Sequence, residues 1–79
     1  MKKGIRLFLD ASVWIAAAGS RAGASALVLE LCRLARTMAV SSRLVLLEVE
    51  RNIRGKLGEE ALLRFYRDIA SLELELIRT

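Results

Sequence analysis

The stretch Ile5-Arg6-Leu7-Phe8-Leu9-Asp10-Ala11-Ser12-Val13-Trp14 decides how this chain folds. Its apolar first half is short and ends abruptly at Asp10, which predicts a buried β-strand rather than a turn of helix. Residues 11–18 are mostly alanine and other apolar residues, and they predict a helix that begins directly after the strand. An acidic side chain is therefore expected at the junction between a strand and a helix.

Three more helices are predicted by apolar residues that recur on one helical face, in residues 25–36, 43–53 and 59–69. The stripe of the first contains Leu27, Leu31 and Leu34, with charged residues opposite. Each stripe is expected to face the core. The other two stripes are Val45, Leu46, Val49 and Ile53, and Leu62, Phe65, Tyr66 and Ile69.

Two further strands are predicted, at residues 38–40 and in the alternating apolar and acidic residues 72–76. Between strands the chain has helices and no hairpin signals, which favours an α/β fold: a three-layer α/β/α arrangement with a parallel sheet, in the order β-α-α-β-α-α-β. A sheet of three strands is small. We expect one strand edge to be exposed unless another segment or another chain covers it.

The composition bounds the size and the surroundings of this fold. The 79 residues, 54% hydrophobic and 28% charged, allow one domain. The net charge of +4 suits an acidic partner such as RNA or DNA, but the basic residues are scattered among acidic ones and fit a solvated surface equally. Cys32 is the only cysteine, which favours a reducing, cytoplasmic compartment. No uninterrupted apolar run reaches membrane-spanning length, so no membrane association is expected.

Asp10 and Glu48 are the residues to which the sequence assigns chemistry. In open parallel sheets, ligands bind beyond the carboxyl ends of the strands, which is where Asp10 sits if the first strand is central, and Glu48 lies one turn into the helix after the second strand. Two carboxylates in one crevice are the minimal version of a Mg²⁺ or Mn²⁺ site. Such a site neutralises charge on a phosphodiester and activates water.

Plainer roles exist for the same residues. Asp10 can cap the next helix, and Glu48 can form a surface ion pair with Arg51 or contact Asn52. Ser12 can cap the helix or hydrogen-bond a metal-bound water. Trp14 is expected in the core, and Glu60 and Asp68 are both expected to pair with Arg64 one helical turn away.

Asp10 also occupies the position of a phosphoryl-accepting nucleophile at a strand end. Haloacid-dehalogenase-like phosphatases carry a second Asp two positions on, where this chain has Ser12. Receiver domains need further acidic residues and a later lysine. Because neither pattern is met, this hypothesis ranks below the metal site.

The residues from Leu7 to Ile15 resemble the opening strand and acidic turn of PIN domains, which have an apolar strand, Asp, a small residue, Asn or Ser, and then Val. Residues 20–25, the leucine-rich helix after them and residues 41–49 resemble the family's second segment, whose helix carries the second acidic residue. The resemblance implies a ribonuclease fold with a parallel sheet and a pocket of carboxylates that binds Mg²⁺ or Mn²⁺. Many members are VapC-like toxins of toxin–antitoxin pairs.

In this resemblance Asp10 is a catalytic metal ligand, Glu48 a second carboxylate and Ser12 a polar support for the pocket. The expected substrate is RNA and an expected partner is a cognate antitoxin. Phosphate contacts are assigned to three arginines: Arg21, Arg51 and Arg54.

The resemblance covers the N-terminal part of a PIN-like domain, because PIN domains continue with further aspartates and strands. Residues 1–79 are therefore expected to form an incomplete or inactive site on their own, complemented by a second segment or by another copy in a homo-oligomer. The alternative, from a different functional class, is a non-catalytic module that uses an exposed sheet edge to oligomerise or bind a partner.

Overall fold

The computed structural model describes residues 5–20, 23–34 and 37–78. Within these ranges no single helix is long and apolar enough to cross a membrane. The element order is the predicted one. It runs β1 (Ile5–Phe8), α1 (Ala11–Gly19), α2 (Ala24–Arg33), β2 (Thr37–Ser42), α3 (Arg43–Lys56), α4 (Glu59–Ser71) and β3 (Leu74–Ile77).

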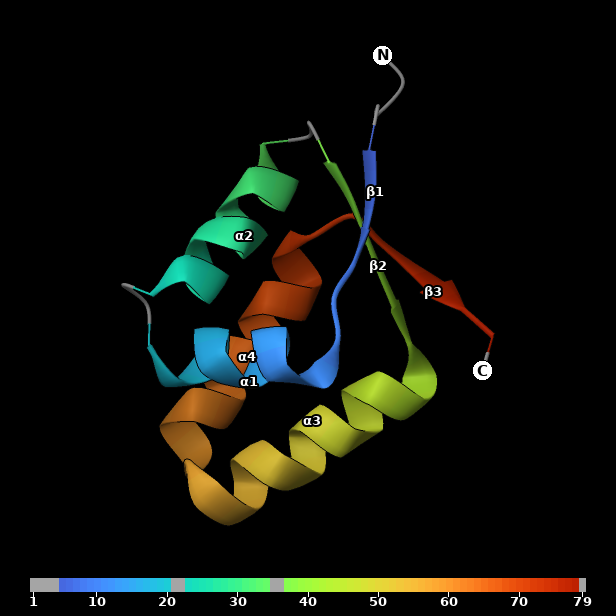
Figure 1. Cartoon of the computed structure of the whole chain (residues 1–79). Helices are drawn as coiled ribbons and strands as arrows, with labels where there is room; N and C mark the ends of the chain where they lie inside the picture. Colours follow the sequence, from blue (N-terminus) through green and yellow to red (C-terminus); the bar gives the residue numbers. More distant parts are fainter. Residues whose placement is uncertain (1–4, 21–22, 35–36, 79) are drawn as a thin grey trace.

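The three strands form a parallel sheet in which β2 lies between β1 and β3. Both crossovers step in the same direction across the sheet, and right-handed crossovers of this kind place their helices on one face. The four helices accordingly lie together on one side of the sheet (Figure 1). The predicted α/β class and parallel sheet are confirmed, in the form of an incomplete three-layer arrangement.

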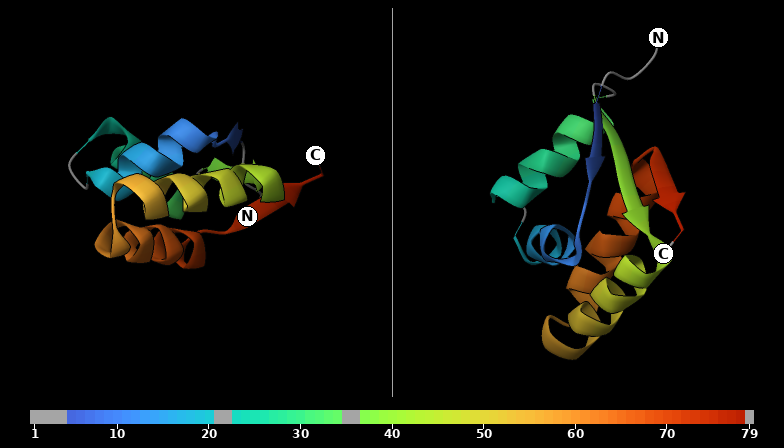
Figure 2. Two further views of the ribbon diagram at one scale, coloured as in Figure 1. Left: turned by 90° about the horizontal axis from the view of Figure 1, so that it is seen from below. Right: turned by 45° about the vertical axis from the view of Figure 1, so that its right-hand side comes forward.

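The core lies between the sheet and the helices. Trp14 of α1 and Phe65 of α4 meet edge to face, with ring centroids 5.8 Å apart and planes at 82°. Helices α1, α3 and α4 contact one another around this pair (Figure 2). Trp14 is buried, as predicted, and Cys32 is buried as well.

The two faces of the sheet differ in what covers them. Leu7, Ala39 and Leu74 are register partners, and Ala39 and Leu74 pack in the helix-covered core. Side chains alternate along a strand, so their neighbours Phe8, Val40 and Glu75 point to the opposite side, here called the outer face. On this face Arg6 reaches across β2 to Glu75 with a 2.7 Å ion pair. No helix within the described ranges covers the outer face.

The prediction of a buried first strand is wrong. All four residues of β1 are exposed, and burial begins at Leu9, immediately after the strand. The physical reason is position: β1 is an edge strand and not a central one, and even Leu7, on the helix side of the sheet, is 39% exposed. An apolar run specifies a strand but not how many of its sides are covered.

The predicted stripe of α2 is also wrong. Leu27 is 61% exposed, and Leu31 and Leu34 are exposed too, whereas Leu29 and Cys32 are buried. Because α2 is apolar on more than one side, periodicity alone does not decide which side packs. Tyr66 was likewise expected in the α4 stripe and is exposed.

The stripe predicted for α3 is confirmed by buried Val49 and Ile53. Ser42 caps the start of the helix, because its Oγ accepts a hydrogen bond from the Val45 amide at 3.2 Å. It continues to Lys56, past its predicted end, and the chain turns at Gly58, whose positive φ of 88° favours glycine.

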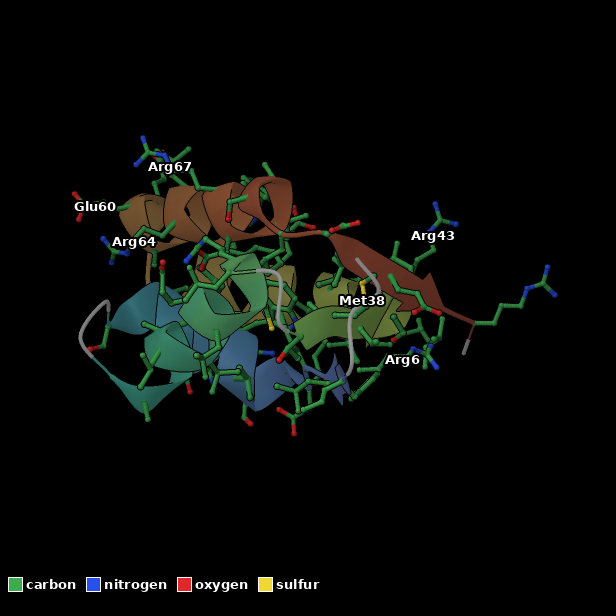
Figure 3. All side chains as sticks on the ribbon, turned by 90° about the horizontal axis from the view of Figure 1, so that it is seen from above. Arg6, Met38, Arg43, Glu60, Arg64 and Arg67 are labelled. Carbon is green, nitrogen blue, oxygen red and sulfur yellow. The ribbon has the colours of Figure 1, made fainter. Side chains whose placement is uncertain are left out.

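The predicted pairing of Asp68 with Arg64 is wrong, while that of Glu60 with Arg64 is confirmed at 3.3 Å (labelled in Figure 3). Asp68 instead forms a 2.7 Å ion pair with Arg33 on α2. The side chain of Asp68 is 13% exposed and that of Arg33 is 28% exposed. Helical spacing identifies neighbours on one helix, but it does not show a competing cation on another helix.

Candidate functional site

The site begins with a buried network of hydrogen bonds around Leu9, at the end of β1. The Leu9 amide donates to the Val40 carbonyl at 2.8 Å. The Leu9 carbonyl accepts from Ser41 Oγ at 3.1 Å and from Trp14 Nε1 at 3.2 Å. Ser41 and Trp14 are fully buried, so the residue directly before Asp10 is fixed to the central strand.

Ser41 is the residue that sequence reasoning missed, since no role in the site was assigned to it. The available signal was a small hydroxyl next to the apolar residues of a central strand. A buried hydroxyl there needs a partner, and the free carbonyl at the end of the neighbouring strand supplies one.

Asp10 is the N-cap of α1. Its Oδ1 accepts a hydrogen bond from the Val13 amide at 3.2 Å and from Ser12 Oγ at 2.7 Å. These bonds, the Ser12 hydroxyl first and the Val13 amide second, lower the pKa of the Asp10 carboxyl below its usual 3.8. The carboxylate is exposed and ionised at neutral pH, and no salt bridge joins it to another described residue.

The capping role foreseen for Asp10 is therefore confirmed, while a capping role for Ser12 is wrong. Ser12 donates to the Asp10 carboxylate instead. Asp10 is the better cap because it stands one residue before the helix, with extended backbone angles (φ −80°, ψ 177°) that aim its side chain at the free amides of the first turn.

Glu48 lies on the second turn of α3, and its side chain is exposed. Asn52 Nδ2 donates to the Glu48 backbone carbonyl at 2.9 Å, and the predicted ion pair with Arg51 is not formed among the described residues. No hydrogen bond joins Glu48 to Asp10 there. The described ranges contain no group of three or more His, Cys, Asp or Glu that could hold a metal ion.

The arginines assigned to phosphate differ in their surroundings. Arg54 donates to Glu50 at 3.1 Å and to the Tyr66 hydroxyl at 3.4 Å. Tyr66 in turn donates to Glu50, which lowers the pKa of that carboxyl and raises the pKa of the tyrosine. Arg51 is exposed and lines one surface hollow together with Arg54. Arg21 lies outside the described residues.

No protein-family model matches the chain, and no curated protein or solved structure matches it significantly. An ionised, exposed carboxylate at the carboxyl end of a parallel strand, steadied by a neighbouring hydroxyl, is suited to bind a hydrated divalent cation.

Proposed function

We propose that this chain is the Mg²⁺- or Mn²⁺-binding part of a PIN-like ribonuclease of the toxin–antitoxin type, acting in the cytoplasm. The observation that carries the proposal is the Asp10 carboxylate: exposed, ionised, and held beyond the end of β1 by the buried bonds of Leu9. A carboxylate fixed in this way is preorganised for a cation, since its support does not have to be built when the ligand arrives.

The two carboxylates, Asp10 and Glu48, match the number of protein ligands that Mg²⁺ commonly takes. Mg²⁺ retains several waters and is commonly bound through one or two carboxylates plus substrate phosphates. Asp10 would provide the first carboxylate and Glu48 the second, with Ser12 holding the orientation of Asp10. A bound cation would neutralise charge on a phosphodiester and activate water for its hydrolysis.

Arg51 is the favoured phosphate contact in this proposal, because Arg54 already donates to Glu50 and Tyr66. The net charge of +4 favours approach of RNA at low ionic strength. A second chain or segment would supply the further carboxylates of a complete catalytic site, so cleavage by this chain alone is expected to be weak or absent.

Metal binding is the deciding measurement. Titration with Mn²⁺ is expected to broaden the backbone NMR signals of Asp10, Ser12 and Val13, and Asp10→Asn should abolish this broadening. Glu59→Gln is the matched control, because Glu59 is also an acid at a helix N-terminus but lies away from the strand ends. Broadening that is absent in the wild type, or unchanged in Asp10→Asn, would refute the proposal.

RNA cleavage is the second readout. Any Mn²⁺-stimulated cleavage of a fluorescent RNA should disappear in Asp10→Asn and persist in Glu59→Gln. Cleavage that survives Asp10→Asn would show that Asp10 is not part of the reaction.

The second candidate, a non-catalytic module that associates through its sheet, is favoured by the exposure of every residue of β1, including Ile5 and Phe8. Sedimentation equilibrium tests it. A dimer that Phe8→Glu dissociates would support this candidate, and a stable monomer at high concentration would argue against it.

A further inference from the structure

A groove lies between the start of α3 and the end of β3. Its volume is about 750 Å³, and its lining includes Leu44, Leu47, Leu76, Ile77 and, at the rim, Arg43 and Arg78. We call this the α3–β3 groove. Leu44 is 62% and Leu47 is 54% exposed. Leucines gathered in a hollow and open to solvent mark a place where another apolar surface can be buried.

The rim of the groove is positively charged. Within the described residues neither Arg43 nor Arg78 makes an ion pair, and Figure 3 shows Arg43 projecting beside β3. Arg43 is the first residue of α3, where a cation opposes the helix dipole, and the first turn has no acidic residue to offset it. Arg43 therefore does not stabilise α3 through the helix dipole. Its charge adds to the positive potential of the helix N-terminus.

This surface continues along α3. A second hollow shares Leu47 with the groove and is lined further by Glu50, Arg51, Arg54 and Gly55. Among the described residues that line the two hollows, the one acid is Glu50, and Arg54 and Tyr66 already donate to it. Helix α3 has 14 residues and is about 21 Å long, which is enough to lie alongside several turns of a second helix.

We propose that the α3–β3 groove docks an amphipathic helix of a partner protein, with leucine-like residues on one face and Asp or Glu beside them. The leucines of the groove would bury the apolar face, and Arg43 and Arg78 would pair with the flanking acids. A flat lipid surface fits a concave hollow less well. Nucleic acid is also disfavoured in the α3–β3 groove itself, because its described lining residues include no aromatic side chain on which a base could stack.

The test uses two synthetic helical peptides, each with leucine at every third or fourth position, flanked by glutamate in one and by lysine in the other. The lysine peptide is expected to bind at least about 10-fold more weakly by fluorescence anisotropy, because it places like charges opposite the rim. Backbone NMR shifts caused by the glutamate peptide should map to residues 43–47 and 76–78.

Matched variants locate the site. Leu47→Asp should weaken binding of the glutamate peptide by at least about 10-fold, because it places a charge in the apolar floor. Leu27→Asp, at an exposed leucine on α2, should leave binding unchanged. The double variant Arg43→Glu and Arg78→Glu should reverse the preference to the lysine peptide.

Several results would overturn the proposal. Equal binding of both peptides would show that Arg43 and Arg78 do not pair with acidic residues of the partner. Unchanged peptide binding in Leu47→Asp would show that the peptide binds elsewhere. Self-association that Leu47→Asp abolishes would make a second copy the occupant, and binding of phosphatidylserine vesicles instead of the peptide would make it a lipid surface. Asp10→Asn should bind the peptide normally, which separates this proposal from the metal site.

Discussion

The two faces of the sheet carry similar side chains in different surroundings. On the covered face Ala39 and Leu74 pack in one core with Trp14 and Phe65, whereas on the outer face Phe8 of the edge strand is 46% exposed and Val40 of the central strand is buried. Strands that are apolar on both sides are typical of sheets covered on both sides. The difference teaches that the stability of this chain comes from one face, while the other is available for contacts.

Replacing one phenylalanine on each side tests this comparison most strongly. Phe65 is 1% exposed, so Phe65→Ala is expected to cost about 3–5 kcal/mol of unfolding free energy. Phe8 is 46% exposed, so Phe8→Ala should cost at most about 1 kcal/mol. Urea unfolding followed by circular dichroism measures both. Equal costs would mean that something covers the outer face.

Breaking the buried hydrogen-bond network around Leu9 should lower the free energy of unfolding by less than Phe65→Ala does. Ser41→Ala removes one of two donors to the Leu9 carbonyl and is expected to cost about 1–3 kcal/mol. It should also shift the emission of Trp14, whose indole nitrogen lies 3.4 Å from Ser41 Oγ. Ser12→Ala is the control, because Ser12 is exposed and its hydroxyl donates to Asp10, away from the Leu9 carbonyl. An unchanged emission spectrum in Ser41→Ala would contradict the placement of Ser41 beside the Trp14 indole.

The strands and helices show which parts of the fold can be predicted from the sequence. The order of strands and helices was predictable because each period, two or 3.6, is a local property of the chain. The order of the strands within the sheet was not predicted, because parallel connections alone do not say which strand is central. Which face is covered was not predictable, as β1 and the stripe of α2 show, since coverage depends on elements that are distant in sequence.

The candidate site divides in the same way. Asp10 was identifiable because a strand end and a helix start are both visible in the sequence. Ser41 was missed because its partner, the Leu9 carbonyl, lies 32 residues away. The pairing of Asp68 with Arg33 joins two helices across 35 residues, and no spacing rule connects them.

The carboxyl edge, where both faces end, should show a pH effect. The pKa of Asp10 is lowered in the folded chain, so its contribution to stability is present above the unfolded value of about 3.8 and is lost as pH falls through the folded value. Asp10→Asn should therefore be less stable than the wild type at pH 7. The gap should narrow as the pH falls below 4, measured by thermal unfolding. A gap that is constant with pH would mean that ionisation of Asp10 does not contribute.

The smallest effect is expected on the outer face. Arg6→Gln should cost less than about 1 kcal/mol, because the Arg6–Glu75 pair is exposed and its attraction is screened by water and salt. A double-mutant cycle with Glu75→Gln, at low and high salt, isolates the coupling. A large coupling that salt does not change would indicate that this face is shielded from water.

One long-range hydrogen bond joins α4 to the end of α1. Arg64 of α4 donates from Nε to the carbonyl of Ala18 at 2.8 Å and so closes the C-terminus of α1 from 46 residues away. Helix α1 has nine residues and no basic residue in its last turn, which makes it marginal in isolation. Its amide protons should therefore exchange with solvent at the rate at which α4 opens, so that the helix next to Asp10 and the last helix of the chain form one cooperative unit.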